Sequence, residues 1–479
     1  MSPLALVLDQ GGHSTRAMVF DENGALVAQA SIPVNTVIKQ AGWIEQDAVE
    51  LVASLQSVLL QVADQLGRRC SDVQSAALIV QRSSLVAWDK LSHTILSPVL
   101  SWQDTRNSEW LEKILTDNRD SIRQSTGLYP NAHYGASKIR WLLDHLPAVN
   151  SAAEKRSLCI APLASFLHQQ LTGVSEPVVD AVIASRTMLT DIAATSWSTA
   201  LLDLFGIPAA ILPEIKPSLA NYGVIRLGDC HVPLRLLGGD QSFFAMSHGD
   251  MFNSDAVFIN AGTGAFIQQK TQPALVPDKL LCSALCVVEN NSGAIIVAEG
   301  TVNAAATALD WLWKRIGFVF SAEDWNLAIG QAVSEPASVP YFINRITASG
   351  SPDWLPAGES CFSMDSSSAL QAVAVLESIV FALQRNLDCL AVVQPCKKII
   401  VSGGLSTLGI FCQRISDLAE KPVWRSDDVE ACARGAAMQL LPKTAGQQKY
   451  HHYMPQVNLH LKQRYTQWST AMDQLARPV

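Results

Sequence analysis

Three glycine-containing bends are the segments of this sequence best suited to binding a phosphate. They span residues 9–16, 260–264 and 402–404, and each follows an apolar run typical of a buried strand. Glycine lets the main chain approach an anion closely, and neighbouring N–H groups and hydroxyls supply donors. A glycine bend between two strands is more often an ordinary hairpin, so no single bend establishes a phosphate site.

Two aspartates, Asp9 and Asp240, follow predicted strands and lie beside or within such glycine-rich turns. A carboxylate in that position can hold hydrated Mg²⁺ or accept the proton of a substrate hydroxyl. The alternative is that both side chains only cap turns. Because similar strand–bend–strand patterns recur in both halves of the chain, we expect Asp9 and Asp240 to flank one point from opposite sides.

The elements that must position these residues indicate an α/β protein. Residues 4–33 predict an antiparallel meander, and apolar residues at helical spacing predict a helix over 47–66 followed by a buried strand at 75–80. The pattern begins again near residue 235, and a helix over 369–390 leads into another strand. A chain of 479 residues favours two domains, which we place at 1–236 and 237–479.

Composition and missing motifs narrow the classes of function. With 35 basic and 43 acidic residues the chain has no basic footprint for nucleic acid, and no apolar stretch reaches the roughly 18 uncharged residues of a membrane span. The N-terminus has no basic leader, so we expect a cytoplasmic protein. Neither a P-loop nor a dinucleotide-binding G-x-G-x-x-G fingerprint is present. We therefore expect a small-molecule partner, no nucleic acid and no membrane, and leave homo-oligomerisation open.

Taken in order, eleven blocks resemble the FGGY family of carbohydrate kinases, and in particular its glycerol-kinase branch. The blocks are LDQGGHSTRAMVFDENG at 8–24, GWIEQD at 42–47, QRSSLVAWDK at 81–90, SWQDTR at 101–106, GASKIRWLLDH at 135–145, SRTMLTDI at 185–192, LFGIPAAILPEIKPS at 204–218, GGDQSFFAMSHG at 238–249, NAGTGAF at 260–266, EGTVNAAATALDWL at 299–312 and VSGGLS at 401–406.

This resemblance implies two ribonuclease-H-like domains of the actin/hexokinase type, flanking a cleft where ATP and Mg²⁺ serve to phosphorylate a sugar or polyol. It implies that Asp9 positions the metal and that Asp240 is the catalytic base. The residues implied for the nucleotide are Gly11, Gly12, His13, Ser14, Thr15, Arg16, Gly262, Thr263, Gly264, Ala306, Asp310, Gly403 and Gly404. Those implied for the substrate are Arg82, Ser83, Trp102, Asp104, His133, Tyr134, Asp240 and Gln241.

Alternatives stay open for several of these residues. Arg82 could instead be a structural ion-pair partner, and Trp102 with Asp104 a buried aromatic beside a capping acid. The pocket tyrosine of the family corresponds to His133 or, one position later, to Tyr134.

The chain also departs from the family pattern. Gly12 and His13 replace hydroxyl-bearing residues of the first phosphate loop, and Ser83 replaces the glutamate of the glycerol-kinase pocket. Near the adenine site, Ala306 and Asp310 differ from the usual glycine and glutamine. We expect a substrate other than glycerol, such as a longer polyol or a ketose. The alternative function is that of a catalytically weakened homologue that senses a sugar or nucleotide.

Overall fold

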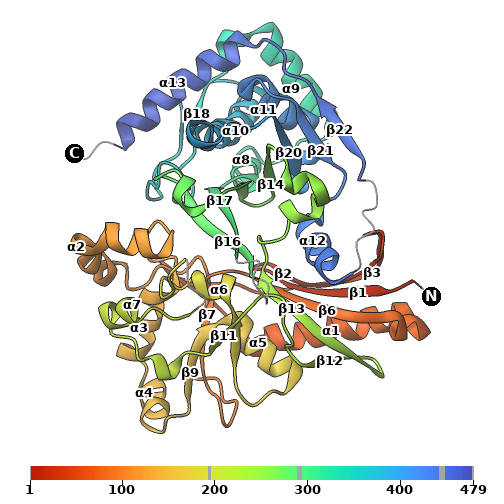
Figure 1. Ribbon diagram of the computed structural model, residues 1–479. Helices are drawn as coiled ribbons and strands as arrows, with labels where there is room; N and C mark the ends of the chain where they lie inside the picture. Colours follow the sequence, from red (N-terminus) through yellow and green to blue (C-terminus); the bar gives the residue numbers. More distant parts are fainter. Residues whose placement is uncertain (1, 193–195, 288–293, 442–447, 477–479) are drawn as a thin grey trace. The chain divides into compact units, whose positions relative to one another are not determined.

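The computed structural model describes residues 2–192, 196–287, 294–441 and 448–476 (Figure 1). Its contacts divide the chain into two units, which are described separately. Unit 1 comprises Met1–Gly249, Cys282–Ile296 and Cys432–Gln447, and unit 2 comprises Asp250–Leu281, Val297–Ala431 and Gln448–Val479. The boundary expected between 236 and 237 falls inside the strand Cys230–Gly239. The first segment of unit 1 continues beyond this strand to Gly249.

A six-stranded mixed sheet in the order β12-β13-β6-β1-β2-β3 forms the centre of unit 1. Its strands are β1 (Leu4–Gln10), β2 (Ser14–Asp21), β3 (Leu26–Pro33), β6 (Val73–Val80), β12 (Val224–Leu227) and β13 (Cys230–Gly239). β1, β2 and β3 form the predicted antiparallel meander, whereas β1, β6 and β13 run parallel. Central parallel strands are covered on both faces and therefore apolar along their length, as the fully buried β1 illustrates.

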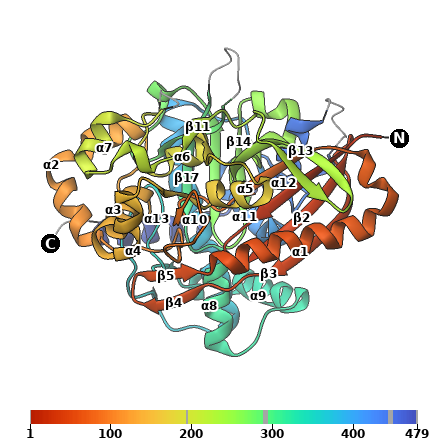
Figure 2. The same cartoon turned by 90° about the horizontal axis from the view of Figure 1, so that it is seen from below.

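The helix predicted over 47–66 is present as α1 (Ala48–Leu66). Asp47 caps it by accepting hydrogen bonds from the backbone N–H groups of Val49 and Glu50. Figure 2 shows α1 lying along β2 and β3, and its buried residues join one core with those of α5 (Leu163–Thr172). This layer supports the sheet whose strand ends carry Asp9 and Asp240.

A second sheet of unit 1 has the order β4-β5-β8-β7-β9. Its strands are β4 (Val37–Gln40), β5 (Trp43–Gln46), β7 (Leu85–Asp89), β8 (Val99–Leu100) and β9 (Leu158–Pro162). The elements that complete this part of the unit are α2 (Ser108–Thr126), α3 (Gly135–His145), α4 (Pro147–Glu154), α6 (Ala181–Ser185), α7 (Thr199–Phe205), β10 (Val178–Asp180) and β11 (Glu214–Lys216). Leu85 of β7 pairs with Leu100 of β8, so the loops 81–84 and 101–104 leave the sheet side by side.

A seven-stranded sheet of order β16-β17-β15-β14-β20-β21-β22 repeats the strand plan of the six-stranded sheet. Its strands belong to unit 2, apart from most of β16 and the start of β17, which are assigned to unit 1. Its strands are β14 (Ala256–Ala261), β15 (Ala265–Lys270), β16 (Leu281–Val287), β17 (Ala294–Val302), β20 (Lys398–Ser402), β21 (Val423–Ser426) and β22 (Tyr450–Tyr453). β14 and β15 form an antiparallel hairpin, and β14, β20 and β21 run parallel. The twofold resemblance predicted from the sequence is therefore confirmed in the topology of the two sheets.

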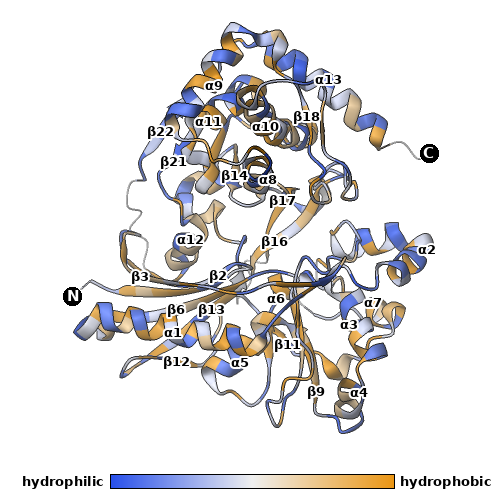
Figure 3. Cartoon of the chain, turned by 180° about the vertical axis from the view of Figure 1, so that it is seen from behind, coloured by the Kyte–Doolittle hydropathy of each residue, from blue (hydrophilic) through white to orange (hydrophobic). Residues whose placement is uncertain are grey.

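The helix predicted over 369–390 is α10 (Ser368–Val393), which lies in the core of unit 2. Its neighbours are α8 (Ala306–Ile316), α9 (Ala322–Ser334), α11 (Gly409–Ala419), α13 (Leu459–Leu475) and the short strand β18 (Phe342–Ile343), which pairs with β19 (Cys361–Phe362). The helix α12 (Ala431–Leu440) belongs almost wholly to unit 1. In the described part of the chain, α10 is long and apolar enough to cross a membrane by length and composition, but most of its apolar window is buried. Figure 3 shows α10 largely in apolar colours, whereas the exposed α2 is mostly hydrophilic.

Candidate active site

The carboxyl ends of β1, β6 and β13 bring the expected catalytic residues to one edge of the unit 1 sheet. Gln81 N–H donates to the Gln10 carbonyl at 2.8 Å, and Asp240 N–H donates to the Val80 carbonyl at 3.0 Å. Asp9 and Asp240 therefore flank β6 within one sheet. The expectation that they face each other from two halves is wrong, because β13 pairs with β6 and completes the first sheet instead of opening the second.

The Asp9 carboxylate is buried and contacts the Arg16 guanidinium, which lies opposite it in the β1–β2 register. Burial raises the pKa of the Asp9 carboxyl, and the positive charge of Arg16 opposes that increase. Arg16 thus acts as the counter-charge of Asp9 in the described structure.

Asp240 is partly exposed at the same edge. Burial raises the pKa of its carboxyl to about 7; the charge of Arg82 opposes that increase, and the neighbouring carboxylate of Asp9 adds to it. A carboxylate whose pKa lies near neutrality can accept a proton from a substrate hydroxyl and release it again. The general-base role of Asp240 stays a prediction, and the structure adds Arg82 as its electrostatic partner.

The first glycine bend joins β1 to β2, and hydrogen bonds from residues outside the bend hold it in place. Gly11 N–H donates to the Ser14 carbonyl at 3.0 Å, and the Gly12 carbonyl accepts from the Thr36 hydroxyl and the Gln46 amide. His13 is exposed. Packing also favours glycine at position 12, since a Cβ there would lie 3.3 Å from Trp102 Nε1.

Thr15 differs from the rest of this bend. Its hydroxyl lies 2.7 Å from the Ser54 hydroxyl of α1 and is fully buried. Side chains alternate along a strand, so Thr15 points into the core whereas Ser14 and Arg16 point to the other face. The structure does not bring the Thr15 side chain to the bend.

Sequence reasoning missed a buried amide network beneath the bend. Gln81 Nε2 donates to Gln10 Oε1 and to Gln46 Oε1, both at 2.9 Å. The Ser84 hydroxyl donates to Gln81 Oε1 at 3.0 Å and accepts from the Trp102 N–H at 2.9 Å. These glutamines stand in three of the blocks quoted above, but only the fold shows that they meet and link the first glycine bend to the loops 81–84 and 101–104.

Four of the predicted substrate residues, Arg82, Ser83, Trp102 and His133, come together and are called the substrate-side cluster below. The rings of Trp102 and His133 lie 5.6 Å apart in an edge-to-face arrangement. Burial lowers the pKa of His133 well below its usual value, and the charges of Lys138, Arg186 and Arg82 lower it further. His133 is therefore a neutral ring at physiological pH, suited to hydrogen bonding.

Two further predicted residues adjoin this cluster. Tyr134 is buried, with its ring centroid 5.1 Å from that of His133. It stands directly before α3 as the N-cap residue. Gln241 is partly exposed next to Asp240.

Ser83 has two unusual properties. Its backbone has φ of 65°, in the left-handed region that residues other than glycine seldom occupy. Its side chain is 3% exposed, and its hydroxyl has no hydrogen-bond partner among the described residues. Buried hydroxyls are normally satisfied, so Ser83 has spare hydrogen-bonding capacity for a ligand.

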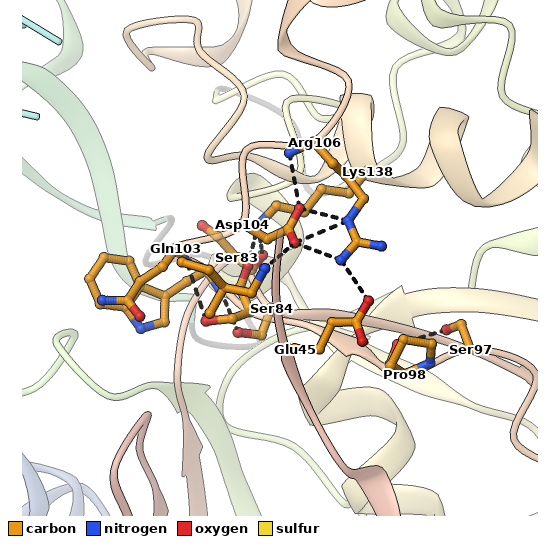
Figure 4. A network of polar contacts seen from close by, with 12 residues as sticks. Glu45, Ser83, Ser84, Ser97, Pro98, Gln103, Asp104, Arg106 and Lys138 are labelled. Carbon is orange, nitrogen blue, oxygen red and sulfur yellow. Dashed lines mark hydrogen bonds and ion pairs between the residues drawn. The ribbon is translucent and has the colours of Figure 1, made fainter. Parts of the chain in front are cut away.

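The contacts of Asp104 differ from those expected of a substrate-binding residue. It is fully buried, pairs with Arg106 through Nε and Nη2, and accepts from the Ile44 N–H at 2.7 Å (Figure 4). Arg106 is sandwiched between Trp43 and Trp141, whose ring centroids lie 4.4 and 4.6 Å from it. These contacts use the Asp104 oxygens to hold the loop 101–104, so Asp104 is a structural anchor.

Unit 2 carries the second glycine bend, between β14 and β15. Gly262 N–H donates to the Gly264 carbonyl at 2.8 Å, and Thr263 is exposed at the tip. The Ala306 N–H at the start of α8 donates to the Gly262 carbonyl at 3.1 Å. The Ala305 and Thr307 N–H groups donate to the Thr263 carbonyl, so the carbonyls of this bend cap the first turn of α8. Asp310 lies exposed on α8, one turn further along.

The third bend follows β20. Gly403 has φ of 87°, and a Cβ there would lie 2.6 Å from both the Ala261 carbonyl oxygen and Asn260 Oδ1. Gly404 has open space around its Cα. Since Asn260 and Ala261 end β14, the second and third bends meet at one edge of the unit 2 sheet.

Repeated ribonuclease-H-like sheets with glycine bends at their strand ends define this chain as a two-domain phosphotransferase of the actin/hexokinase type. Residues 4–243 match the N-terminal domain of the FGGY family of carbohydrate kinases, and residues 257–441 match its C-terminal domain. The glycerol kinase of Trichlorobacter lovleyi is 31% identical over 443 residues, covering 90% of this chain and 88% of that protein.

Two solved structures are similar over almost the whole chain. A Plasmodium falciparum glycerol kinase with ADP has a TM-score of 0.86 at 20% identity, covering 100% of this chain and 99% of that one. A ligand-bound xylulose kinase from Lactobacillus acidophilus has a TM-score of 0.83 at 17% identity, covering 99% and 98%. This chain belongs to the FGGY family of carbohydrate kinases. It is an ATP-dependent carbohydrate kinase of the glycerol-kinase-like branch.

Proposed function

We propose that this kinase phosphorylates a hydroxyl of a sugar or polyol larger than glycerol, such as a longer polyol or a ketose. The observation that carries the proposal is Ser83, which stands where the glycerol-kinase branch has a glutamate. A serine is smaller and neutral, and its hydroxyl is buried without a described partner. A site built to pair hydroxyls discriminates strongly by which of them it satisfies.

In the proposed reaction Asp240 accepts the proton of the substrate hydroxyl. The hydroxyl oxygen then bonds to the γ-phosphorus of ATP, and the bond from that phosphorus to the β,γ-bridging oxygen breaks, which releases ADP. Arg82 stabilises the ionised carboxylate of Asp240 before the proton is taken up. Phosphoryl transfer depends mainly on positioning and charge neutralisation, and these residues supply both.

The residues at the sheet edge fit Mg²⁺, which the family implies. Among the described residues no group of three or more His, Cys, Asp and Glu side chains could hold a metal ion. Mg²⁺ needs only one or two carboxylates, since waters and nucleotide phosphates complete its octahedron. Asp9 would supply such an oxygen, and the ion would neutralise charge on the phosphates.

The nucleotide would be held by the unit 2 residues Gly262, Thr263, Gly264, Ala306, Gly403 and Gly404. This assignment is supported by the meeting of the second and third bends at one sheet edge. It requires no side chain of the P-loop type, because backbone N–H groups of glycine-rich bends can bind phosphate.

A substrate panel tests the proposal. The purified protein is incubated with ATP, Mg²⁺ and either glycerol, four- to six-carbon polyols or ketoses, and ADP release is followed. We expect a longer polyol or ketose to have a higher kcat/KM than glycerol. Glycerol as the best substrate would refute the proposal; binding by calorimetry without turnover of any compound would favour a sensor instead.

A further inference from the structure

Lys138 is a fully buried lysine on α3 whose amine bonds to main chain of two different loops. Its Nζ donates to the Ser83 carbonyl at 3.0 Å and to the Ser101 carbonyl at 2.7 Å (Figure 4). The first carbonyl lies in the loop after β6, and the second lies in the loop after β8. One side chain therefore ties together the two loops that leave the second sheet side by side.

Each bonded carbonyl lies at or next to the substrate-side cluster. Ser83 is itself a member and directly follows Arg82, and Ser101 directly precedes Trp102. Ser83 has the left-handed backbone described above, and the Lys138 bond is made by the carbonyl of that same residue. A strained backbone persists when its surroundings determine it, and this hydrogen bond is such a determinant.

The electrostatic setting of Lys138 also requires an explanation. Burial lowers the pKa of its amine to about 7, with Asp104 opposing the decrease and Arg106 adding to it. Both the protonated and the neutral amine have enough N–H groups to donate to two carbonyls. A methionine would fill similar space but would leave the Ser83 and Ser101 carbonyls without this donor, so the amine is what holds the two loops to each other.

We propose that Lys138 is a positioning residue for the carbohydrate, which sets substrate affinity by holding the Ser83 and Ser101 carbonyls in place. This inference rests on the proposed role of the substrate-side cluster. Lys138 acts through Arg82, Ser83 and Trp102, and the 101–104 loop that it holds is fixed from its other side by Asp104 and Arg106.

The test compares Lys138→Met with the wild-type enzyme on the best carbohydrate found in the substrate panel. Because small misplacements of a reacting group are costly, we expect kcat/KM for the carbohydrate to fall by about 10- to 100-fold, with KM for ATP changed less than about 2-fold. Gln169→Leu is the matched control. Gln169 is a buried amide that bonds Trp88 Nε1 away from the cluster, so its loss should lower stability without changing carbohydrate KM.

A double-mutant cycle with Ser83→Gly separates positioning from a general structural effect. Glycine adopts the left-handed conformation without strain, so Lys138→Met should reduce kcat/KM at least about threefold less in the Ser83→Gly background. Additive effects in the cycle, an equal increase in both KM values, or unchanged carbohydrate kinetics would each overturn the proposal.

The remaining outcomes are also decisive. If Lys138→Met does not fold, Lys138→Gln is measured in its place, and failure of both to fold assigns Lys138 to the core and overturns the proposal. If the wild-type enzyme itself phosphorylates no carbohydrate, the proposed function fails before any variant is compared.

Discussion

Asp9 lies near the end of β1, and Asp240 directly follows β13. Both strands pair in parallel with the same central strand, β6. The two carboxylates are close enough for Asp9 to raise the pKa of Asp240, and each has an arginine as counter-charge, Arg16 for Asp9 and Arg82 for Asp240. The ends of parallel strands converge on one sheet edge, where ligands of α/β proteins commonly bind. The residues proposed to act on the reacting hydroxyl therefore lie in unit 1.

Replacing the proposed base tests its role directly. Asp240→Asn should lower kcat by about 10²- to 10⁴-fold, the range for losing a general base, while carbohydrate binding changes little. Steady-state kinetics and calorimetry of the variant measure the two quantities. Unchanged turnover would remove Asp240 from the proton transfer.

The pH dependence of the rate follows from the same residue. With the pKa of Asp240 raised to about 7, the base is protonated in more acidic solution, so kcat should fall about tenfold per pH unit below 7. A profile measured from pH 5 to 9 should show this limb. A rate independent of pH across that interval would contradict it.

Stability should respond to pH through Asp240 in the opposite direction. Its folded-state pKa lies above the ordinary 3.8, so the folded protein binds more protons between about pH 4 and 7. Asp240 therefore stabilises the fold at low pH and loses that contribution as pH rises towards 7. Denaturant unfolding at several pH values should show wild type losing stability relative to Asp240→Asn over this interval; a constant difference would contradict the assignment.

Asp9 should govern the metal requirement. Asp9→Asn replaces the carboxylate proposed to hold Mg²⁺ with a neutral amide and should raise the Mg²⁺ concentration for half-maximal activity about tenfold or more. Asp229→Asn is the control, because Asp229 is a fully exposed acid of the same unit. Equal Mg²⁺ dependence of the two variants would exclude Asp9 as a ligand.

Removal of the Ser83 hydroxyl should affect the substrate more than the fold. Since this hydroxyl has no partner among the described residues, Ser83→Ala should change the free energy of unfolding by less than about 0.5 kcal/mol. Loss of a hydrogen bond to the carbohydrate should raise its KM by about 3- to 10-fold. Chemical denaturation and kinetics measure the two effects, and a destabilised variant with unchanged KM would reverse the interpretation.

The glycines of the third bend offer a matched pair. Gly403→Ala introduces a methyl group 2.6 Å from two oxygens at a positive φ and should cost about 1–3 kcal/mol or more, with weaker ADP binding. Gly404→Ala meets no atom within 4 Å and should melt like the wild-type protein. Equal melting temperatures for the two variants would contradict the geometry of this bend.

Local pattern in the sequence was sufficient for the fold class, the meander, the helices over 47–66 and 369–390, and the repeated strand plan. These features depend on short-range periodicity and turn residues, which the sequence displays directly. The identity of Asp9 and Asp240 as the acids at the glycine turns was likewise available from order and residue type.

Only the tertiary structure decided which partners these residues have. Strand pairing placed β13 in the first sheet, so Asp240 joined Asp9 beside β6. Arg106 donates to the carboxylate of Asp104, and the Ser54 hydroxyl bonds to that of Thr15. Lys138 donates to carbonyls of two loops. Apart from the Asp104–Arg106 pair, which is two residues apart, these contacts join residues distant in sequence. Sheet register and side-chain direction fix them, and both are set by packing of the whole unit.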